Sequence, residues 1–284
     1  MIQTAPEWDR EFIFTEQDFY VLRELINRHT GICLSEAKKE LVYSRLTRRL
    51  RQLKLKSFAK YCQYLQSESS GEELVHFINA VTTNLTAFFR EPHHFEYLCR
   101  SLLPELAAKK SGKQRYRFWS AGCSTGEEPY SMAMCISETL PFENSFDIKI
   151  LATDLDSSVL DVAISGLYPI EKLKVILPHR QNKWFPKGES FNHGLMQVRP
   201  DLQNLITFRQ LNLMHEWPMK GPFDAIFCRN VVIYFDKSTQ RILVDRFANL
   251  LGPGGYLFLG HSESLFKVTD RFKLVGQTIY QKIR

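Results

Sequence analysis

Three apolar runs in the C-terminal part of the chain each end in small or polar residues, and this repeated pattern constrains the fold most. The runs are YRFWSAGCSTGEEP at 116–129, IKILATDLD at 148–156 and FDAIFCRNVVIYFD at 223–236. Helical patterns separate them, which is typical of an open parallel sheet with helices on both faces. Ligands bind such sheets at the carboxyl ends of the strands. The polar ends therefore predict a nucleotide-type pocket.

Residues 115–284 follow this alternation throughout, which predicts an α/β domain with a doubly wound sheet. Gly, Asn and Pro with short alternating runs at 185–198 interrupt it and predict a small antiparallel β-subdomain near 180–200. We expect strands near 116–121, 148–153, 206–210, 223–228, 255–260 and 272–282, and helices near 128–139, 156–164, 171–177 and 238–250.

Residues 1–90 show helical periodicity instead and predict an all-α N-terminal domain. A linker at 91–114, with a connecting helix followed by a loop, joins it to the α/β domain. Thr15-x-x-Asp18 is a capping signal, and Ser35 is placed to cap a basic helix. Between Lys38 and Lys60 there are nine Lys and Arg residues against one acid, Glu40. One face of this helix is apolar, and the opposite, solvent-directed arc carries Arg45, Arg48 and Arg51. Such an arc is either a solvated face or a docking surface for an acidic helix or nucleic acid.

Composition excludes several other classes of protein. The chain has 284 residues, 44% of them hydrophobic, which is enough for a substantial core. It shows no apolar run of membrane-spanning length, and its first residues carry charges where a secretory signal would be apolar, so we expect a cytoplasmic protein without membrane insertion. The six cysteines form no C-x-x-C pair and lack clustered histidine partners. They predict reduced thiols, with neither a disulfide framework nor a metal site.

The first strand-to-helix turn, residues 120–128, lacks a full G-x-G-x-x-G, and two glutamates at the helix start would repel a phosphate. Asp154 ends the next strand, where an acidic side chain accepts hydrogen bonds from ribose hydroxyls; the alternative is that it caps the following helix. A ligand with a ribose and a cationic amino-acid part but no phosphate is S-adenosylmethionine.

Two further segments carry polar residues in apolar surroundings. Arg229 and Asn230 follow the 223–228 strand and indicate a ligand or substrate contact, or a structural clamp on loops; Tyr234 indicates a crevice residue or a packed aromatic. TTNLTAFFRE at 82–91 presents Asn84, Thr86 and Arg90, which favour a lid or cleft wall, with a helix cap as the alternative.

These segments resemble the signature blocks of one family. NLTAFFRE, WSAGCSTGEEPYS, FDAIFCRNVVIYFD and GHSE at 260–263 are similar, in the same order, to those of the chemotaxis receptor methyltransferases, the CheR family. The resemblance covers nearly the whole chain. It implies a Rossmann-like methyltransferase domain after a helical receptor-docking domain, S-adenosylmethionine as cofactor, S-adenosylhomocysteine as product, and methyl esterification of receptor glutamates.

The resemblance also implies roles for single residues. The positions nearest the transferring methyl, hence catalytic, are Arg90 and Tyr234. The cofactor contacts are Asn84, Thr86, Arg90, Glu128, Asp154, Asn212, Leu213, Arg229 and Asn230. The receptor-docking contacts are Lys38, Arg45, Arg48, Arg49 and Arg51.

The implied partner is the cytoplasmic domain of a methyl-accepting chemotaxis receptor, and some family members also grip a receptor C-terminal peptide with the β-subdomain. We expect a monomer that binds no nucleic acid. A nucleic-acid methyltransferase stays open as a rival because a basic stripe also suits a phosphate backbone, although no D/N-P-P-Y tetrapeptide is evident. A second rival is a receptor-associated protein that binds the cofactor without turnover.

Overall fold

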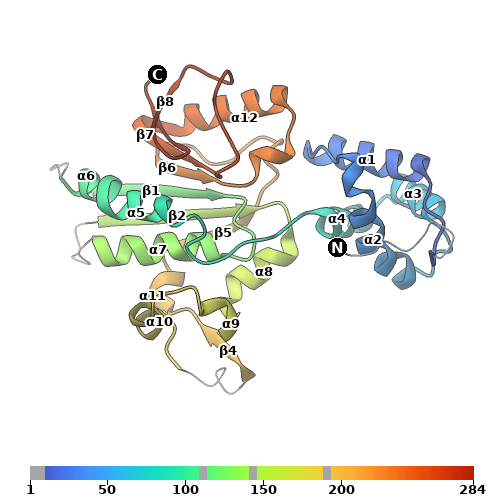
Figure 1. Cartoon of the computed structure of the whole chain (residues 1–284), viewed down its shortest axis with the longest axis horizontal. Helices are drawn as coiled ribbons and strands as arrows, with labels where there is room; N and C mark the ends of the chain where they lie inside the picture. The colour runs from blue at the N-terminus through green and yellow to red at the C-terminus, as the bar shows by residue number, and fades with distance from the viewer. Residues whose placement is uncertain (1–9, 109–113, 141–145, 188–192) are drawn as a thin grey trace. The chain divides into compact units, whose positions relative to one another are not determined.

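The computed structural model describes residues 10–108, 114–140, 146–187 and 193–284. The chain forms two compact units, Met1–Thr83 and Asn84–Arg284 (Figure 1). This division falls seven residues before the end that the sequence suggests for the helical domain. Within the described residues, no helix is both long and apolar enough to cross a membrane.

The first unit consists of helices. They are α1 (Glu16–Thr30), the short 3₁₀ helix η2 (Glu36–Lys38), α2 (Lys39–Gln52), α3 (Phe58–Ser67) and α4 (Glu72–Val81). The expected capping box is present, because the Thr15 hydroxyl accepts from the Asp18 N–H at 3.1 Å and the Asp18 carboxylate accepts from the Thr15 N–H at 2.9 Å. The expected cap by Ser35 is wrong: a 3₁₀ turn leads into α2, and the Ser35 side chain makes no capping bond.

The apolar face of α2 forms part of the core of this unit. Val42, Leu46 and Leu50 are fully buried, as the helical periodicity predicts. Beside them the Phe14 and Phe58 rings lie with their centroids 4.3 Å apart.

Two of the α2 arginines serve the fold of this unit. Arg49 forms a two-nitrogen ion pair with Glu73 of α4, whose carboxylate also accepts from the Tyr61 hydroxyl at 2.8 Å. Glu73 is only 3% exposed, so Arg49 neutralises a buried charge. Arg45 donates to the terminal carbonyls of α4, including that of Val81 at 3.1 Å. The prediction that Arg45 lies on a solvent-directed arc is therefore wrong, because its guanidinium caps a neighbouring helix.

The second unit is the α/β domain. Its helices are α5 (Pro92–Tyr97), the π-helical turn η3 (Leu98–Leu102), α6 (Leu103–Ala108), α7 (Glu127–Thr139), α8 (Ser157–Ser165), α9 (Ile170–Leu173), α10 (Pro178–Trp184), α11 (Pro200–Gln203), the 3₁₀ helix η5 (Val232–Tyr234) and α12 (Lys237–Leu250). Its strands are β1 (Gln114–Ala121), β2 (Phe146–Asp154), β3 (Leu167–Pro169), β4 (Leu195–Gln197), β5 (Ile206–Gln210), β6 (Phe223–Cys228), β7 (Leu251–Leu259), β8 (Phe272–Gly276) and β9 (Ile279–Lys282).

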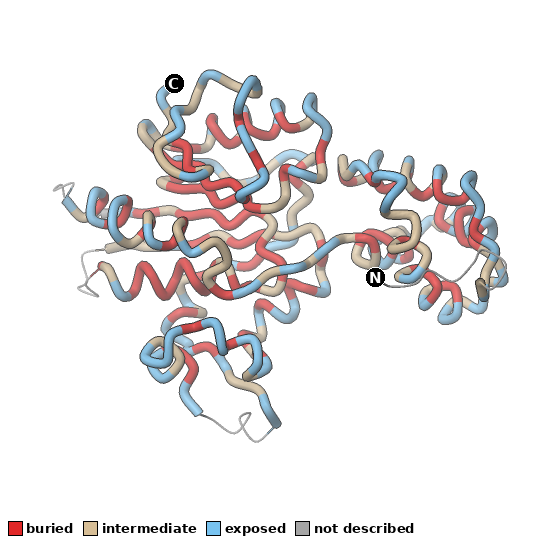
Figure 2. Tube along the Cα trace, in the orientation of Figure 1, coloured by how far each residue is buried: buried red, intermediate tan, exposed pale blue. Residues whose placement is uncertain are grey.

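The described strands form a seven-stranded sheet in the order β5-β2-β1-β6-β7-β9-β8, parallel except for β9, which pairs antiparallel with both β7 and β8. Helices cover both faces, with α7 and α12 on opposite sides (Figure 1). Successive residues of β1 show why: Phe118 belongs to the core that includes α7, whereas Trp119 packs edge-on against Phe247 of α12. The central strands and α7 are buried along most of their length (Figure 2).

The α/β fold predicted from the sequence is confirmed, with local differences. The expected strand at 272–282 is the hairpin of β8 and β9. The small antiparallel sheet pairs β3 with β4, so it begins before the expected 185–198 excursion; residues 188–192 of that excursion lie outside the described residues. The segment that the sequence suggests as a linker with a connecting helix carries α5, η3 and α6. Leu98, Leu102 and Leu103 of these helices belong to the core of the second unit.

The Arg49–Glu73 pair yields a stability prediction. We expect Arg49→Ala to lower the free energy of unfolding of the helical unit by about 2 to 4 kcal/mol, because it leaves the Glu73 carboxylate buried without its cation. Urea unfolding of the full chain, followed by circular dichroism, measures the loss. Arg48→Ala is the matched control, since Arg48 is exposed on the same helix, and it should change stability by less than about 0.5 kcal/mol. Equal losses in the two variants would contradict this role of the pair.

Candidate active site

The carboxyl ends of four neighbouring parallel strands bring together the polar segments that the sequence singled out. In the sheet order β5, β2, β1, β6, these ends lie side by side. The register pairs Ala121 at the end of β1 with Thr153 of β2, and Asp154 with Gln210 at the end of β5. The turns that follow each strand therefore share one edge, the place where open parallel sheets bind ligands.

The turn after β1 is shaped by glycines at positive φ. Gly122 has a φ of 87°, and a Cβ built on it would lie 2.4 Å from a methyl carbon of Val231, which follows β6. The N–H groups of Gly122 and Cys123 both donate to the Thr153 carbonyl, at 2.8 and 2.9 Å. Only glycine combines this conformation with so close an approach, so the turn lies tightly against its neighbouring strand ends.

Asp154 ends β2 with its carboxylate held by backbone donors. Its two oxygens accept from the N–H groups of Ser124 at 2.7 Å and of Asp156 at 3.0 Å. Burial raises the pKa of Asp154 to about 6, although these backbone hydrogen bonds act in the opposite direction. The residue that caps α8 is Asp156, whose carboxylate accepts from the Ser158 N–H at 2.9 Å. The capping role considered for Asp154 therefore belongs to Asp156.

The two glutamates at the start of α7 are directed to different partners. Glu127 is fully buried and pairs with Lys172, while its other oxygen accepts from the Thr125 hydroxyl at 2.6 Å. Glu128 accepts from the Ser120 hydroxyl at 2.7 Å and pairs with Arg229 at 3.1 Å. Burial raises the pKa of Glu128, and the positive charge of Arg229 partly opposes that rise. Both carboxylates thus have partners within the second unit.

Arg229 follows β6 and is almost completely buried, with 2% of its side chain exposed. Its guanidinium contacts Glu128 on one side and Glu91 at 3.2 Å on the other, and it also donates to the Arg90 carbonyl. The group therefore ties the strand end, α7 and the 84–91 segment together. This is the clamp that the sequence offered as one alternative, and Arg229 lies at the carboxyl edge directly after β6.

Asn230 adopts a positive φ of 59°, and a buried glutamate holds its backbone. The Glu263 carboxylate accepts from the N–H groups of Asn230 at 2.9 Å, Ile233 at 3.1 Å and Gly260. Burial raises the pKa of Glu263, while these backbone donors lower it. A Cβ on Gly260 would lie 2.8 Å from the backbone nitrogen of Asn230, so this position after β7 also requires glycine. Glu263 thus shapes the loop that carries Tyr234.

The 84–91 segment is anchored along the second unit. The Asn84 amide donates to the Asp156 carboxylate at 2.7 Å, and its carbonyl accepts from the Ser124 hydroxyl at 3.0 Å. Thr86 is half-buried. Arg90, also half-buried, donates from one guanidinium nitrogen to the Leu85 carbonyl at 2.6 Å and forms no ion pair within the described residues. Among the charged groups of this edge, Arg90 therefore keeps donors available for a ligand or substrate.

The remaining predicted site residues lie on the loops after β5 and β6. Asn212 accepts from the Met214 N–H at 2.9 Å and contacts the His215 ring at 3.3 Å. Leu213 is buried, and its carbonyl accepts from Arg246 at 2.6 Å. Tyr234 ends η5 half-buried.

Comparison with protein-family models matches the chain twice. Residues 84–281 match "CheR methyltransferase, SAM binding domain", and residues 17–82 match "CheR methyltransferase, all-alpha domain". The chain belongs to the CheR methyltransferase family. Being a member of that family, it is an S-adenosylmethionine-dependent methyltransferase, and the two matched domains coincide with the two compact units.

Curated relatives resemble this CheR-family methyltransferase over nearly its full length. Chemotaxis protein methyltransferase 2 of Pseudomonas aeruginosa is 48% identical over 96% of this chain and 95% of its own. The chemotaxis protein methyltransferase of Escherichia coli is 46% identical over 94% of this chain and 91% of its own. That of Salmonella typhimurium is 44% identical over 94% and 90%.

Two residues of this CheR-family site were not assigned roles from the sequence. Glu91 pairs with Arg229 and accepts from the His261 ring at 2.8 Å. Burial pushes the pKa of Glu91 upward, but the His261 hydrogen bond and the Arg229 charge outweigh it and bring that pKa to about 2. Glu263 is the second. Both lie inside the quoted blocks NLTAFFRE and GHSE, so their place in those blocks is the signal that could have identified them.

Proposed function

We propose that this methyltransferase transfers the methyl group of S-adenosylmethionine to glutamate side chains of methyl-accepting chemotaxis receptors, giving glutamate γ-methyl esters. The observation that carries the proposal is the similarity to chemotaxis protein methyltransferases across both units, the helical one included. A nucleic-acid methyltransferase that shared only the cofactor-binding domain would match the family over that domain alone. This chain also matches the family's helical domain, over residues 17–82.

The residues at the carboxyl edge fit the cofactor. Asp154 supplies a buried carboxylate that accepts only from backbone donors among its described partners, and a carboxylate has about four acceptor positions. Capacity therefore remains for a ribose hydroxyl. The glycine-shaped turn after β1 lets a ligand approach the backbone. We assign the cofactor contacts to this edge: Asn84, Thr86, Arg90, Glu128, Asp154, Asn212, Leu213, Arg229 and Asn230.

In this assignment Arg229, Asn84 and Glu128 act largely by holding the edge together, since their hydrogen bonds and ion pairs are to other protein groups. When bound, S-adenosylmethionine supplies an electrophilic methyl group on a positively charged sulfur. The substrate glutamate has an unperturbed pKa of about 4.3 and is already ionised at neutral pH, so the enzyme needs no general base. Its own residues must align the carboxylate and exclude water.

Arg90 is the residue we assign to positioning the substrate carboxylate. Its guanidinium is fixed at one nitrogen by the Leu85 carbonyl and has no carboxylate partner within the described residues, unlike Arg229. A fixed fork with unused donors suits carboxylate recognition. Tyr234, half-buried on the neighbouring loop, supplies a ring edge or hydroxyl near the methyl group in the same assignment.

Receptor docking is proposed for the basic residues Lys38, Arg45, Arg48, Arg49 and Arg51. The structure divides these residues by their contacts: Arg45 and Arg49 hold α4, whereas Arg48 and Arg51 are exposed. Arg51 pairs with Glu11 on the surface, an interaction that an acidic receptor helix can replace at little cost. We therefore place the direct contacts at Arg48 and Arg51, with Arg45 and Arg49 acting through the helix that carries them.

Methyl transfer to a receptor cytoplasmic fragment tests the proposed function. Labelled methyl from S-adenosylmethionine should appear on the fragment and be released as methanol by mild base, because carboxyl methyl esters hydrolyse readily. Label on RNA or DNA instead, or none on any receptor, would overturn the proposed substrate and leave the cofactor domain standing. A receptor fragment without its C-terminal peptide tests whether the β3–β4 sheet binds that peptide. If the sheet binds it, the shortened fragment should be methylated more slowly than the full fragment.

Asp154 and Arg90 give contrasting predictions for binding and turnover. Asp154→Asn should weaken S-adenosylmethionine binding about tenfold in calorimetry, because an amide replaces one carboxylate acceptor with a donor. Arg90→Ala should lower turnover about 100-fold, because alignment of the carboxylate is lost, and should lower cofactor affinity less than turnover, because the other cofactor contacts remain. Tyr234→Ala should also lower turnover. The reverse pattern, with Arg90→Ala losing affinity alone, would place Arg90 on the cofactor.

Calorimetry at different pH values tests the contribution of the Asp154 charge to cofactor binding. Its pKa is raised to about 6, so the charged acceptor predominates only above that pH. Affinity for the cofactor should therefore fall as the pH drops from about 7.5 to 5.5. Asp154→Asn should show a flatter profile, and identical profiles in the two proteins would contradict this cause.

Docking through exposed charge predicts a salt-sensitive methylation rate. Arg48→Ala should lower kcat/KM for the receptor fragment about two- to fivefold at low salt and leave cofactor affinity unchanged. The difference from wild type should shrink as salt screens the charge over about 8 Å at physiological ionic strength. Lys273→Ala, an exposed cation of the second unit, is the control and should have no effect. A methylation rate that does not change with salt concentration, or equal effects of the two variants, would rule out this docking surface.

A further inference from the structure

A cluster of one glutamate and two histidines lies directly after Arg90. Glu91 precedes α5, and His93 and His94 lie in the first turn of that helix. One possible ligand atom from each of the three residues lies within 4.8 Å of the other two. The sequence predicted no metal site, because its cysteines lack clustered histidine partners. This cluster contains no cysteine.

Three buried atoms of this cluster have no hydrogen-bond partner among the described residues. They are Oε2 of Glu91, Nε2 of His93 and Nδ1 of His94. His94 is completely buried, and the Glu91 side chain is 10% exposed. Buried polar atoms in folded proteins are nearly always paired with protein groups, water or ions. Oε2 of Glu91 still lies 3.2 Å from the Arg229 guanidinium. The two histidine nitrogens have no hydrogen-bond partner within the described residues, and they indicate a missing ligand.

The hydrogen bonds of His94 determine what kind of ligand is missing. Its Nε2 lies 3.1 Å from the Gln277 carbonyl oxygen, which can only accept, so Nε2 carries the proton. Nδ1 is then a lone pair, and it lies 3.5 Å from Oε2 of Glu91, which is also an acceptor. Two facing acceptors repel each other unless a cation or donor lies between them. An imidazole whose other nitrogen donates to a carbonyl is the usual arrangement of a metal-binding histidine.

The charged groups around the cluster favour the binding of a cation. Arg229 lies 3.2 Å from Oε2 of Glu91, but it also contacts Glu128 at 3.1 Å, so two carboxylates face one guanidinium. His261 contacts the other oxygen of Glu91. Before any metal binds, Glu91, Glu128 and Arg229 together carry one net negative charge, which favours a divalent ion.

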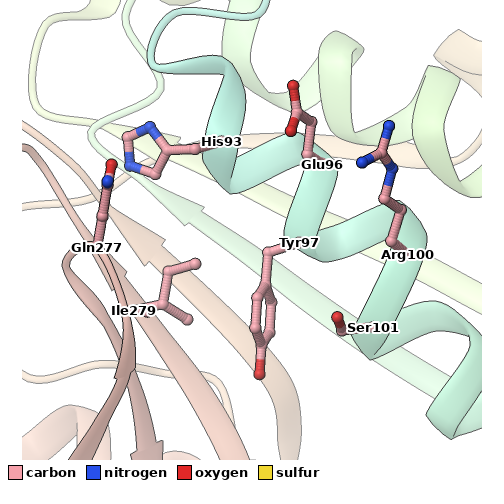
Figure 3. Close-up of a pocket in the computed structure, with 8 residues that line it drawn as sticks. His93, Glu96, Tyr97, Arg100, Ser101, Gln277 and Ile279 are labelled. Carbon is pink, nitrogen blue, oxygen red and sulfur yellow. The ribbon is translucent and has the colours of Figure 1, made fainter.

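A path from solvent reaches the cluster at His93. This residue lines a pocket of about 260 Å³ between α5 and the β8–β9 hairpin, together with Tyr97, Gln277 and Ile279. Figure 3 shows the His93 ring beside Gln277 at one end of this pocket. This pocket therefore brings solvent to the His93 side of the cluster.

We propose that Glu91, His93 and His94 form a binding site for one divalent transition-metal ion, with Zn²⁺ as the best match. Two imidazole nitrogens and one carboxylate oxygen are a common ligand set for Zn²⁺. The ion would fix the start of α5 to the 84–91 segment, next to Arg90. The proposed transfer of the methyl group needs no metal, so the ion would have a structural role beside the site of that transfer.

Binding of Zn²⁺ and Co²⁺ to the tag-free full chain tests the site. After removal of metal with a chelator, the wild type should take up one equivalent of Zn²⁺ in competition with a chromophoric chelator, and Co²⁺ should give visible ligand-field bands. His93→Gln should lower the affinity at least tenfold and abolish the bands, and Zn²⁺ should raise the melting temperature of the wild type but not of this variant. His76→Gln, an exposed histidine of α4, is the matched control and should bind like the wild type.

His93 is chosen because it lines the pocket, whereas replacement of the fully buried His94 could unfold the protein. Melting temperatures without metal confirm that His93→Gln is folded. Absence of a saturable equivalent in the wild type, or equal binding by the wild type and His93→Gln, would overturn the proposal. A crystal structure with a water molecule bridging Glu91 and His94 after soaking with Zn²⁺ would overturn it as well. None of these readouts depends on methyl transfer, so failure here leaves the proposed function untouched.

Discussion

The buried guanidinium of Arg229 is the interaction on which the carboxyl edge depends. It joins the end of β6 to Glu128 of α7 and to Glu91 and the Arg90 carbonyl of the preceding segment. A buried cation is costly unless it is paired, and here two carboxylates and a carbonyl compensate the charge of Arg229. Its pairing therefore fixes three chain segments at once, and the groups that remain free at this edge, such as Arg90, are displayed on that rigid base.

Carboxylates held by backbone N–H groups complete the edge. Asp156 caps α8 and receives the Asn84 amide, Asp154 binds the turn after β1, and Glu263 binds the loop that leads to Tyr234. Each of these acids lies at a strand end or loop, where backbone donors lack partners in the sheet. Hydrogen bonds from backbone N–H groups to carboxylates thus shape the loops. They also leave Asp154 with free acceptor positions, so that the local backbone geometry and cofactor binding depend on the same side chain.

The helical unit shows a similar division between fold and surface. Helical periodicity places the arginines of α2 away from its apolar stripe, yet Arg45 caps α4 and Arg49 neutralises the buried Glu73. Arg48 and Arg51 keep their charge at the surface. A basic helix face is therefore not a uniform docking surface, because long side chains reach buried partners beyond the arc on which their Cα atoms lie.

The sequence by itself determined the two-part organisation, the alternation of strands and helices, and the strand ends at which Asp154, Arg229 and Asn230 lie, because hydrophobic period and turn chemistry are local properties. It also identified the family through ordered blocks. Tertiary structure decided which of these polar groups are partners. Glu91 and Arg229 are far apart along the chain, and nothing local distinguishes a clamp from a ligand contact. The burial of His94 beside Glu91 was likewise decided by packing of α5 against the β8–β9 hairpin, since burial and unpaired lone pairs arise only when distant segments meet.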